Sequence, residues 1–225
     1  METFRIGEAI KYGWGKTKAH FLFLWMVLGI VCGVAIFLNI LSKAVGENSF
    51  LGSAVSLGAT VLGIILQIGL IRIYIDLIDQ DKEDHLDTLF SQTGLFWRYL
   101  GASILYYAVV VVGFILLIIP GIYFSLKYQF YGYLIIDKNF QPFEALKKSA
   151  VMTVGIKWKL LGFSFALVGL NIAGALLLVV GLLVTIPISI LAYVYVYREL
   201  SKRLEVKSAA PAAVEAIPSP VQPGV

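Results

Sequence analysis

The chain has 225 residues, of which 59% are hydrophobic and only 14% are charged, and its mean hydropathy is +0.86. A soluble domain is nearer half apolar and a quarter charged, so this composition excludes an ordinary soluble domain and indicates a membrane protein. The formal net charge of +4 does not indicate nucleic-acid binding, because the positions of the basic residues along the chain explain it better.

Hydropathy predicts an all-α integral membrane protein with six transmembrane helices arranged as three helical hairpins. Each span needs about 20 apolar residues, so six of them leave no room for a folded domain outside the membrane. In chain order, the six expected spans cover residues 21–41, 50–78, 97–119, 121–136, 158–185 and 188–200.

The first span follows a short segment, residues 4–18, that predicts an amphipathic helix. Its basic side chains share one helical face and Trp14 lies on the other, which is typical of a helix in the lipid headgroup layer. The alternative is a lead-in helix that docks on the rest of the protein.

Three features mark the connections between the later spans. Residues 79–93 are acidic but lack the ligand spacing of an EF-hand, so we expect a solvated linker rather than a cation site. Pro120 and Pro187 should each turn the chain between two spans, because proline disfavours helix in the residue before it. The fourth span, residues 121–136, is at the short edge for crossing a bilayer, so we expect either a partly buried kink in this segment or local thinning of the bilayer.

The segment 137–157 repeats the design of the N-terminus, with Pro142 suited to the first turn of a helix. Its sequence Glu-Ala-Leu-Lys matches the Glu-Ala-Ile-Lys that starts at Glu8. We therefore expect a membrane domain over residues 1–205. Its three repeated units cover about 1–79, 80–136 and 137–205, and a disordered tail rich in Ala and Pro follows over 206–225.

The basic residues predict the orientation. With six spans, all 18 of them except Lys43 lie on one side of the membrane, and the positive-inside rule makes that side the cytoplasm. Both termini are then cytoplasmic, in the plasma membrane of the cell. Trp14, Trp97 and Trp158 lie at the same ends of the spans and are expected to anchor them at the interface, together with several tyrosines, including Tyr131, Tyr133 and Tyr193.

A few charged side chains lie inside the expected spans. Arg72 and Asp76 are four residues apart and can pair on one helix face, whereas Lys127 lies about 15 Å into its span. One interpretation is that these side chains extend to the interface and pair with opposite charges. The other is that Arg72 and Lys127 bind a lipid phosphate of the cytoplasmic leaflet. The candidate phosphate contacts are Arg72, Lys127, Lys147, Lys148, Lys157 and Lys159.

The sequence predicts no catalytic, cofactor-binding or metal-binding residue. His20 and His85 are far apart and fit no metal-ligand pattern. The chain also lacks a nucleophile elbow, an intramembrane carboxylate pair and a phosphate-binding loop. We therefore expect that this chain is not an enzyme.

The stretch from Leu116 to Leu161 resembles a known family. It reads LLIIPGIYFSLKYQFYGYLIIDKNFQPFEALKKSAVMTVGIKWKLL. An Ile-Pro-Gly that ends one span, an Asp at the end of the next and a closing Gly-x-Lys-Trp are similar to the membrane domain of bacterial glycerophosphoryl diester phosphodiesterases. They are also similar to a related family of standalone six-helix membrane proteins. The resemblance implies a six-span fold and no phosphodiesterase activity, because the soluble catalytic barrel is absent.

Three functions are consistent with these features. The first is a non-catalytic membrane module whose basic face binds anionic lipid or a protein partner. The second is a transporter or channel for a small solute, with Arg72 and Lys127 in its path. The third is an accessory subunit of a membrane-associated enzyme.

Overall fold

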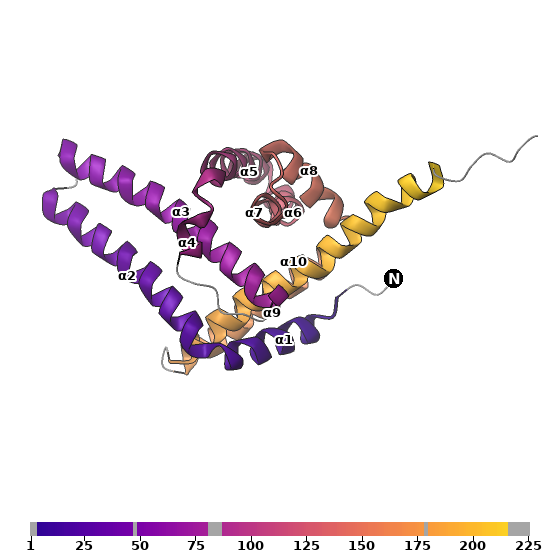
Figure 1. Cartoon of the computed structure of the whole chain (residues 1–225), viewed down its shortest axis with the longest axis horizontal. Coiled ribbons are helices and arrows are strands. Elements are labelled where there is room, and N and C mark those ends of the chain that lie inside the picture. Colours follow the sequence, from indigo (N-terminus) through magenta and orange to yellow (C-terminus); the bar gives the residue numbers. More distant parts are fainter. Residues whose placement is uncertain (1–3, 47–48, 81–86, 178–179, 216–225) are drawn as a thin grey trace, which may run out of the picture.

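The computed structural model describes residues 4–46, 49–80, 87–177 and 180–215, and their regular structure is entirely helical (Figure 1). In chain order the elements are α1 (Ile6–Ala19), α2 (Phe21–Val45), α3 (Phe50–Gln80), α4 (Thr88–Ser91), the 3-10 helix η1 (Thr93–Leu95), α5 (Phe96–Leu116), α6 (Ile118–Tyr128), α7 (Tyr131–Lys138), α8 (Pro142–Met152), α9 (Lys157–Leu176) and α10 (Val180–Glu215).

Five helical segments among the described residues are long and apolar enough to cross a membrane. These segments are Phe21–Val45, Phe50–Gln80, Thr88–Leu116, Lys157–Leu176 and Gly181–Glu205. The protein is therefore a multi-pass membrane protein. The expected fourth span is not among the five, because the chain over residues 121–136 forms two shorter helices, α6 and α7, with a break at Gln129 and Phe130.

Helix α7 lies in the protein core. Most of its side chains are buried, including Leu134, Ile135 and Ile136. It packs against α3, α5 and α8. An apolar helix surrounded by other helices has the same composition as one surrounded by lipid, which explains why hydropathy predicted a single span here.

The helices form three hairpins, α2–α3, α5–α6 and α9–α10, that point in different directions from a common base (Figure 1). Large apolar side chains are exposed near the hairpin tips, for example Phe50 at 87% and Ile119 at 80%. The main core lies at the other end, where α1, α7 and α8 meet the inner ends of α3, α9 and α10. We call this region the base. The sequence repeat that suggested three units remains a prediction.

Both prolines occupy positions that differ from the expectation. Pro120 lies in the first turn of α6, and the chain turns at Leu117, which has extended backbone angles. Pro187 lies inside α10 and does not separate two helices. Proline leaves the carbonyl four residues earlier without its helical partner, and that carbonyl, of Leu183, accepts a hydrogen bond of 2.8 Å from Trp25 Nε1 of α2.

Helix α1 docks on α10, as the alternative interpretation of residues 4–18 proposed. Its buried face consists of Ala9, Gly13 and Thr17, small residues that let the two backbones approach. A Cβ atom at Gly13 would lie 2.6 Å from the Ile188 carbonyl oxygen. Whether the outer face of α1 also contacts lipid headgroups stays a prediction.

The C-terminal segment starts as helix. The backbone of α10 continues to Glu215. The disordered tail expected over residues 206–225 stays a prediction. The remainder of the predicted tail, residues 216–225, lies outside the described residues, as does most of the acidic linker, residues 81–86.

An ionic cluster at the base joins the three hairpins. The Arg198 guanidinium of α10 donates to Asp137 Oδ2 of α7 at 2.8 Å and to Asp79 at the end of α3. Tyr197 donates to the same Asp137 oxygen at 2.7 Å. The side chains of Asp137 and Arg198 are only 7% and 15% exposed, so these charges depend on each other for solvation.

The first prediction concerns this cluster. Arg198→Gln should lower the Tm of the detergent-solubilised protein clearly, because losing one partner of a buried ion pair costs about 3 kcal/mol or more. Lys202→Gln is the matched control on the same helix, because its pair with Glu199 is exposed and should contribute less than about 1 kcal/mol. Equal Tm values for the two variants would contradict the prediction.

The second prediction concerns the docking of α1. Gly13→Leu should destabilise the protein by about 1–3 kcal/mol, because the new side chain must push α1 away from α10. Gly15→Leu on the same helix meets open space and should be neutral or stabilising by up to about 1 kcal/mol through helix propensity. Scanning fluorimetry of both variants checks this, and a Gly13→Leu protein as stable as Gly15→Leu would show that α1 does not depend on this contact.

Candidate functional site

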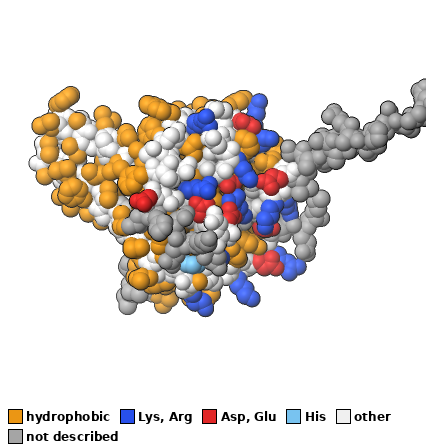
Figure 2. Space-filling model, in the orientation of Figure 1, with side chains coloured by type: hydrophobic (Ala, Val, Ile, Leu, Met, Phe, Trp, Pro, Cys, Tyr) orange, Lys and Arg blue, Asp and Glu red, His pale blue; other side chains and the backbone are white. Residues whose placement is uncertain are grey.

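The basic residues at the base fall into two groups. One group is used by the fold itself: Arg198 and Lys138 form ion pairs, Arg98 Nη1 donates to the carbonyl oxygen of Asn139 at the end of α7, and Lys16 Nζ donates to the Leu77 carbonyl near the end of α3. Figure 2 shows blue Lys and Arg side chains gathered over this end of the molecule, away from the apolar α2–α3 tip.

The second group contains five of the six candidate phosphate contacts. Each of these lysines places its ammonium over an aromatic ring. The pairs are Lys127 with Tyr128, Lys147 with Phe143, Lys148 with Phe140, Lys157 with Tyr123 and Lys159 with Phe4. Within the described part of the chain, Lys127, Lys147, Lys148 and Lys157 form no ion pair with a carboxylate.

Arg72, the sixth candidate, is placed differently. Its Nε donates to Asp76 Oδ2 at 2.7 Å on the same face of α3, and the Asp76 side chain is 9% exposed. The structure therefore shows the pairing that the sequence allowed. Lys127 lies on α6 with its ammonium over the Tyr128 ring, so Arg72 and Lys127 belong to different surroundings.

Lys157 lines an apolar groove between α6 and α9, and Lys127 follows the lining residue Leu126 on α6. Lys157 Nζ lies 3.7 Å from the centroid of the Tyr123 ring, whereas Lys127 Nζ lies 4.9 Å from the centroid of the Tyr128 ring. The groove has a volume of about 450 Å³, and its apolar wall is built from Ile119, Ile122, Leu126, Trp158 and Leu161.

Hydrogen bonds connect the end of α8 to α6 beside this groove. Ser149 Oγ and Thr153 Oγ1 of the α8 end both donate to the Lys127 carbonyl, at 3.1 and 3.2 Å. Gly155 then takes a positive φ of 78°, a conformation in which glycine is favoured, and the turn delivers Lys157 as the first residue of α9. No side chain caps this helix start, so its amide N–H groups and helix dipole also favour an anion.

The three expected tryptophan anchors are exposed. Trp14, Trp97 and Trp158 expose 43%, 77% and 86% of their surface, and Trp158 flanks the groove. Their contact with the membrane interface stays a prediction.

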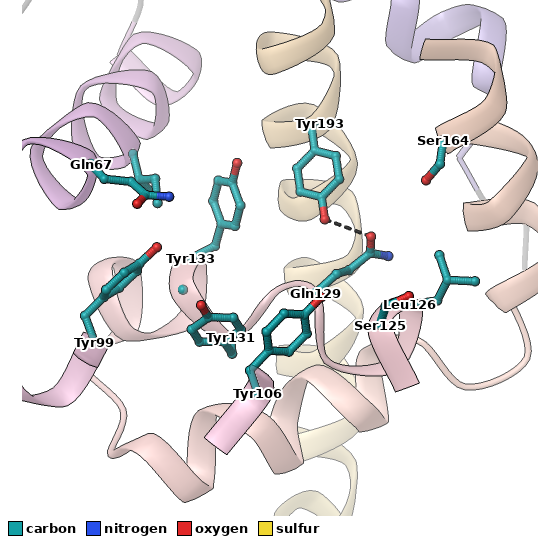
Figure 3. Close-up of a pocket in the computed structure, with 12 residues that line it drawn as sticks. Gln67, Tyr99, Tyr106, Ser125, Leu126, Gln129, Tyr131, Tyr133, Ser164 and Tyr193 are labelled. Atoms are coloured by element: carbon teal, nitrogen blue, oxygen red, sulfur yellow. Dashed lines mark hydrogen bonds between the residues drawn. The ribbon is translucent and has the colours of Figure 1, made fainter. Parts of the chain in front are cut away.

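A second, polar cavity of about 420 Å³ lies where the α6–α7 break faces α3, α5, α9 and α10 (Figure 3). Its polar lining consists of Gln67, Tyr99, Tyr106, Ser125, Gln129, Tyr131, Tyr133, Ser164 and Tyr193. No Asp, Glu, Lys or Arg is among the described residues that line it. Tyr193 donates a hydrogen bond of 2.8 Å to Gln129 Oε1.

Three of the five cavity tyrosines, Tyr131, Tyr133 and Tyr193, were expected in an interfacial belt. Tyr131 is only 8% exposed, and Figure 3 shows it, Tyr133 and Tyr193 facing the cavity. The signal that could have separated them from a belt is the break in α6–α7, because the glutamine and serine at the break share the cavity with them.

No protein-family model matches the chain, so the resemblance to the phosphodiesterase membrane domain stays a prediction. No solved structure matches it either. The chain is similar to two mycobacterial proteins that carry the name "uncharacterized protein", Rv2560 of Mycobacterium tuberculosis and Mb2590 of Mycobacterium bovis. Each is 27% identical over 239 residues, which cover 93% of this chain and 72% of the relative.

Proposed function

We propose that this protein is a non-catalytic membrane module that binds an anionic phospholipid, with the acyl chain in the α6–α9 groove and the phosphate at Lys127 and Lys157. The single observation that carries the proposal is an apolar groove with Lys157 in its lining and Lys127 next to it on α6, two lysines without a carboxylate partner among the described residues. A phospholipid combines an apolar acyl chain with a negatively charged phosphate, which match the apolar wall and the lysines.

The dimensions of the groove fit this occupant. From Ile119 to Leu126 the wall follows α6 for about 10 Å at helical rise, which covers part of an acyl chain. Each buried methylene contributes about 0.8 kcal/mol, and each lysine near an anionic surface contributes about 1 kcal/mol. Neither part is sufficient alone, so we expect the groove to favour anionic lipids over zwitterionic ones with the same chains.

The third prediction tests the lipid site. In native mass spectrometry, the double variant Lys127→Gln with Lys157→Gln should lose phosphatidylglycerol affinity by about 2 kcal/mol, roughly thirtyfold. Its affinity for phosphatidylcholine should change little. The matched control, Lys11→Gln with Lys18→Gln, removes the same charge from α1, which does not line the groove.

Loss of phosphatidylglycerol from both double variants to the same extent would indicate a diffuse basic surface and reject the groove. Retention by both would reject anionic-lipid binding at the base altogether.

We also propose that the base faces the cytoplasm. The support is the position of the basic residues, because Lys43 alone lies near a hairpin tip while the others lie towards the base or beyond it in the sequence. The positive-inside rule applies to short loops of this kind. This orientation places Lys127 and Lys157 at the leaflet that is rich in anionic lipid.

The fourth prediction tests this orientation by cysteine labelling. In a Cys32→Ser background, Lys148→Cys and Lys202→Cys should be protected from a membrane-impermeant maleimide in intact cells, whereas Lys43→Cys should react. Permeabilised cells are the control in which all three should react. Labelling of Lys148→Cys and Lys202→Cys from opposite sides would overturn the shared base.

A small-solute transporter is the second candidate function. The observation that favours it is the interruption of α6–α7 beside a polar cavity, since discontinuous helices line the binding sites of many transporters. Arg72 and Lys127, the path residues expected for this function, do not line the cavity. Flux in proteoliposomes should therefore respond to Gln129→Leu rather than to Lys127→Ala.

A further inference from the structure

The cavity at the α6–α7 break is built for hydrogen bonding without charge. Five tyrosine side chains line it together with two glutamines and two serines. The rings of Tyr106 and Tyr131 stack with centroids 5.0 Å apart, and those of Tyr133 and Tyr193 lie 5.7 Å apart. The lining thus combines flat aromatic faces with hydroxyl and amide groups.

Several of these polar groups have hydrogen-bond donors or acceptors that no protein group uses. Gln129 Nε2 is buried without a hydrogen-bond partner, while its Oε1 accepts from Tyr193. Flipping the amide exchanges the two atoms and leaves the oxygen unpartnered instead. Ser125 and Ser164 donate to the carbonyls of Ile122 and Leu160, so each hydroxyl keeps its acceptor lone pairs. A buried polar group without a partner costs free energy that a ligand can recover.

The chemistry of the lining selects the ligand class. An ion in this cavity would be desolvated without a counter-charge, which is costly. A purely apolar molecule would leave the amide and hydroxyl groups unpaired. The volume of about 420 Å³ lies within the range of small-molecule sites, which combine aromatic walls with a few placed polar groups.

We propose that this cavity binds an uncharged, hydroxyl-rich group of the sugar type, with a ring face against the tyrosines and hydroxyls bonded to Gln129 and Ser164. The group could come from a free sugar or from the headgroup of a neutral glycolipid, because the chemistry presented to the lining is the same. This site shares only Leu126 with the lining of the α6–α9 groove, and the proposal holds whether or not a solute crosses the membrane.

The test uses the full chain in a zwitterionic detergent, since maltoside detergents carry sugar headgroups that would compete. Saturation-transfer NMR titrates methyl glucoside against the solubilised protein, and native mass spectrometry titrates monoglucosyl diacylglycerol against the protein in phosphatidylcholine nanodiscs. Glucuronate and glucosamine are the charged comparators, because each keeps the sugar ring and adds one charge.

Tyr193→Phe and the cavity-filling Ser164→Leu should each weaken binding about tenfold or more, because they remove a hydrogen-bonding group or the space. Tyr195→Phe is the matched control on α10, two residues further on and outside the lining, and should bind like the wild type. Circular dichroism of each variant confirms that it is folded.

Saturable binding in either arm with this variant pattern supports the proposal, and the arm that responds identifies the source. Three outcomes would each overturn the proposal. The folded wild type binds neither ligand, the charged comparators bind as well as the uncharged sugar, or both cavity variants bind like the wild type.

Discussion

The fold depends on the contact between Arg198 and two carboxylates from different parts of the chain. Asp79 ends the first hairpin, Asp137 ends the segment after the second, and Arg198 belongs to the third. Within lipid, apolar helix surfaces gain little by meeting each other, because the acyl chains are equally apolar. Hairpins that diverge from one another therefore need specific polar contacts where they meet, and the ionic cluster supplies them at the base.

This arrangement gives the molecule two kinds of apolar surface. Side chains near the tips, such as Phe50 and Ile119, are exposed and are solvated by acyl chains, whereas those of α7 are enclosed by protein. The groove and the polar cavity lie between these zones, where helices separate enough to leave space but remain close enough to place side chains. Both candidate sites thus follow from the divergence of the hairpins.

Much of the architecture could be predicted from the sequence because lipid imposes a simple rule on composition and length. That rule found five of the six expected spans, all but the fourth, and it placed the basic residues together at one end. It failed for α7, since an apolar segment such as Leu134–Ile136 has the same hydropathy in a protein core as in a bilayer. Lys127 and Lys157 could be proposed from their charge and position, but the contact of Lys157 with Tyr123 depends on the packing of α6 against α9. The pairing of Asp137 with Arg198 joins residues 61 positions apart. Hydrophobic periodicity within single helices does not predict which residues of two distant helices meet.

The hydrogen bond from Trp25 to the Leu183 carbonyl sets an order of events during synthesis. The donor is made early, in the first hairpin, and its acceptor is exposed by Pro187 only when the last hairpin has been inserted. Helix α1, which docks on α10, must wait for the same late partner. The tryptophan of α2 and the docking face of α1 therefore both lack their partner until α10 has been synthesised.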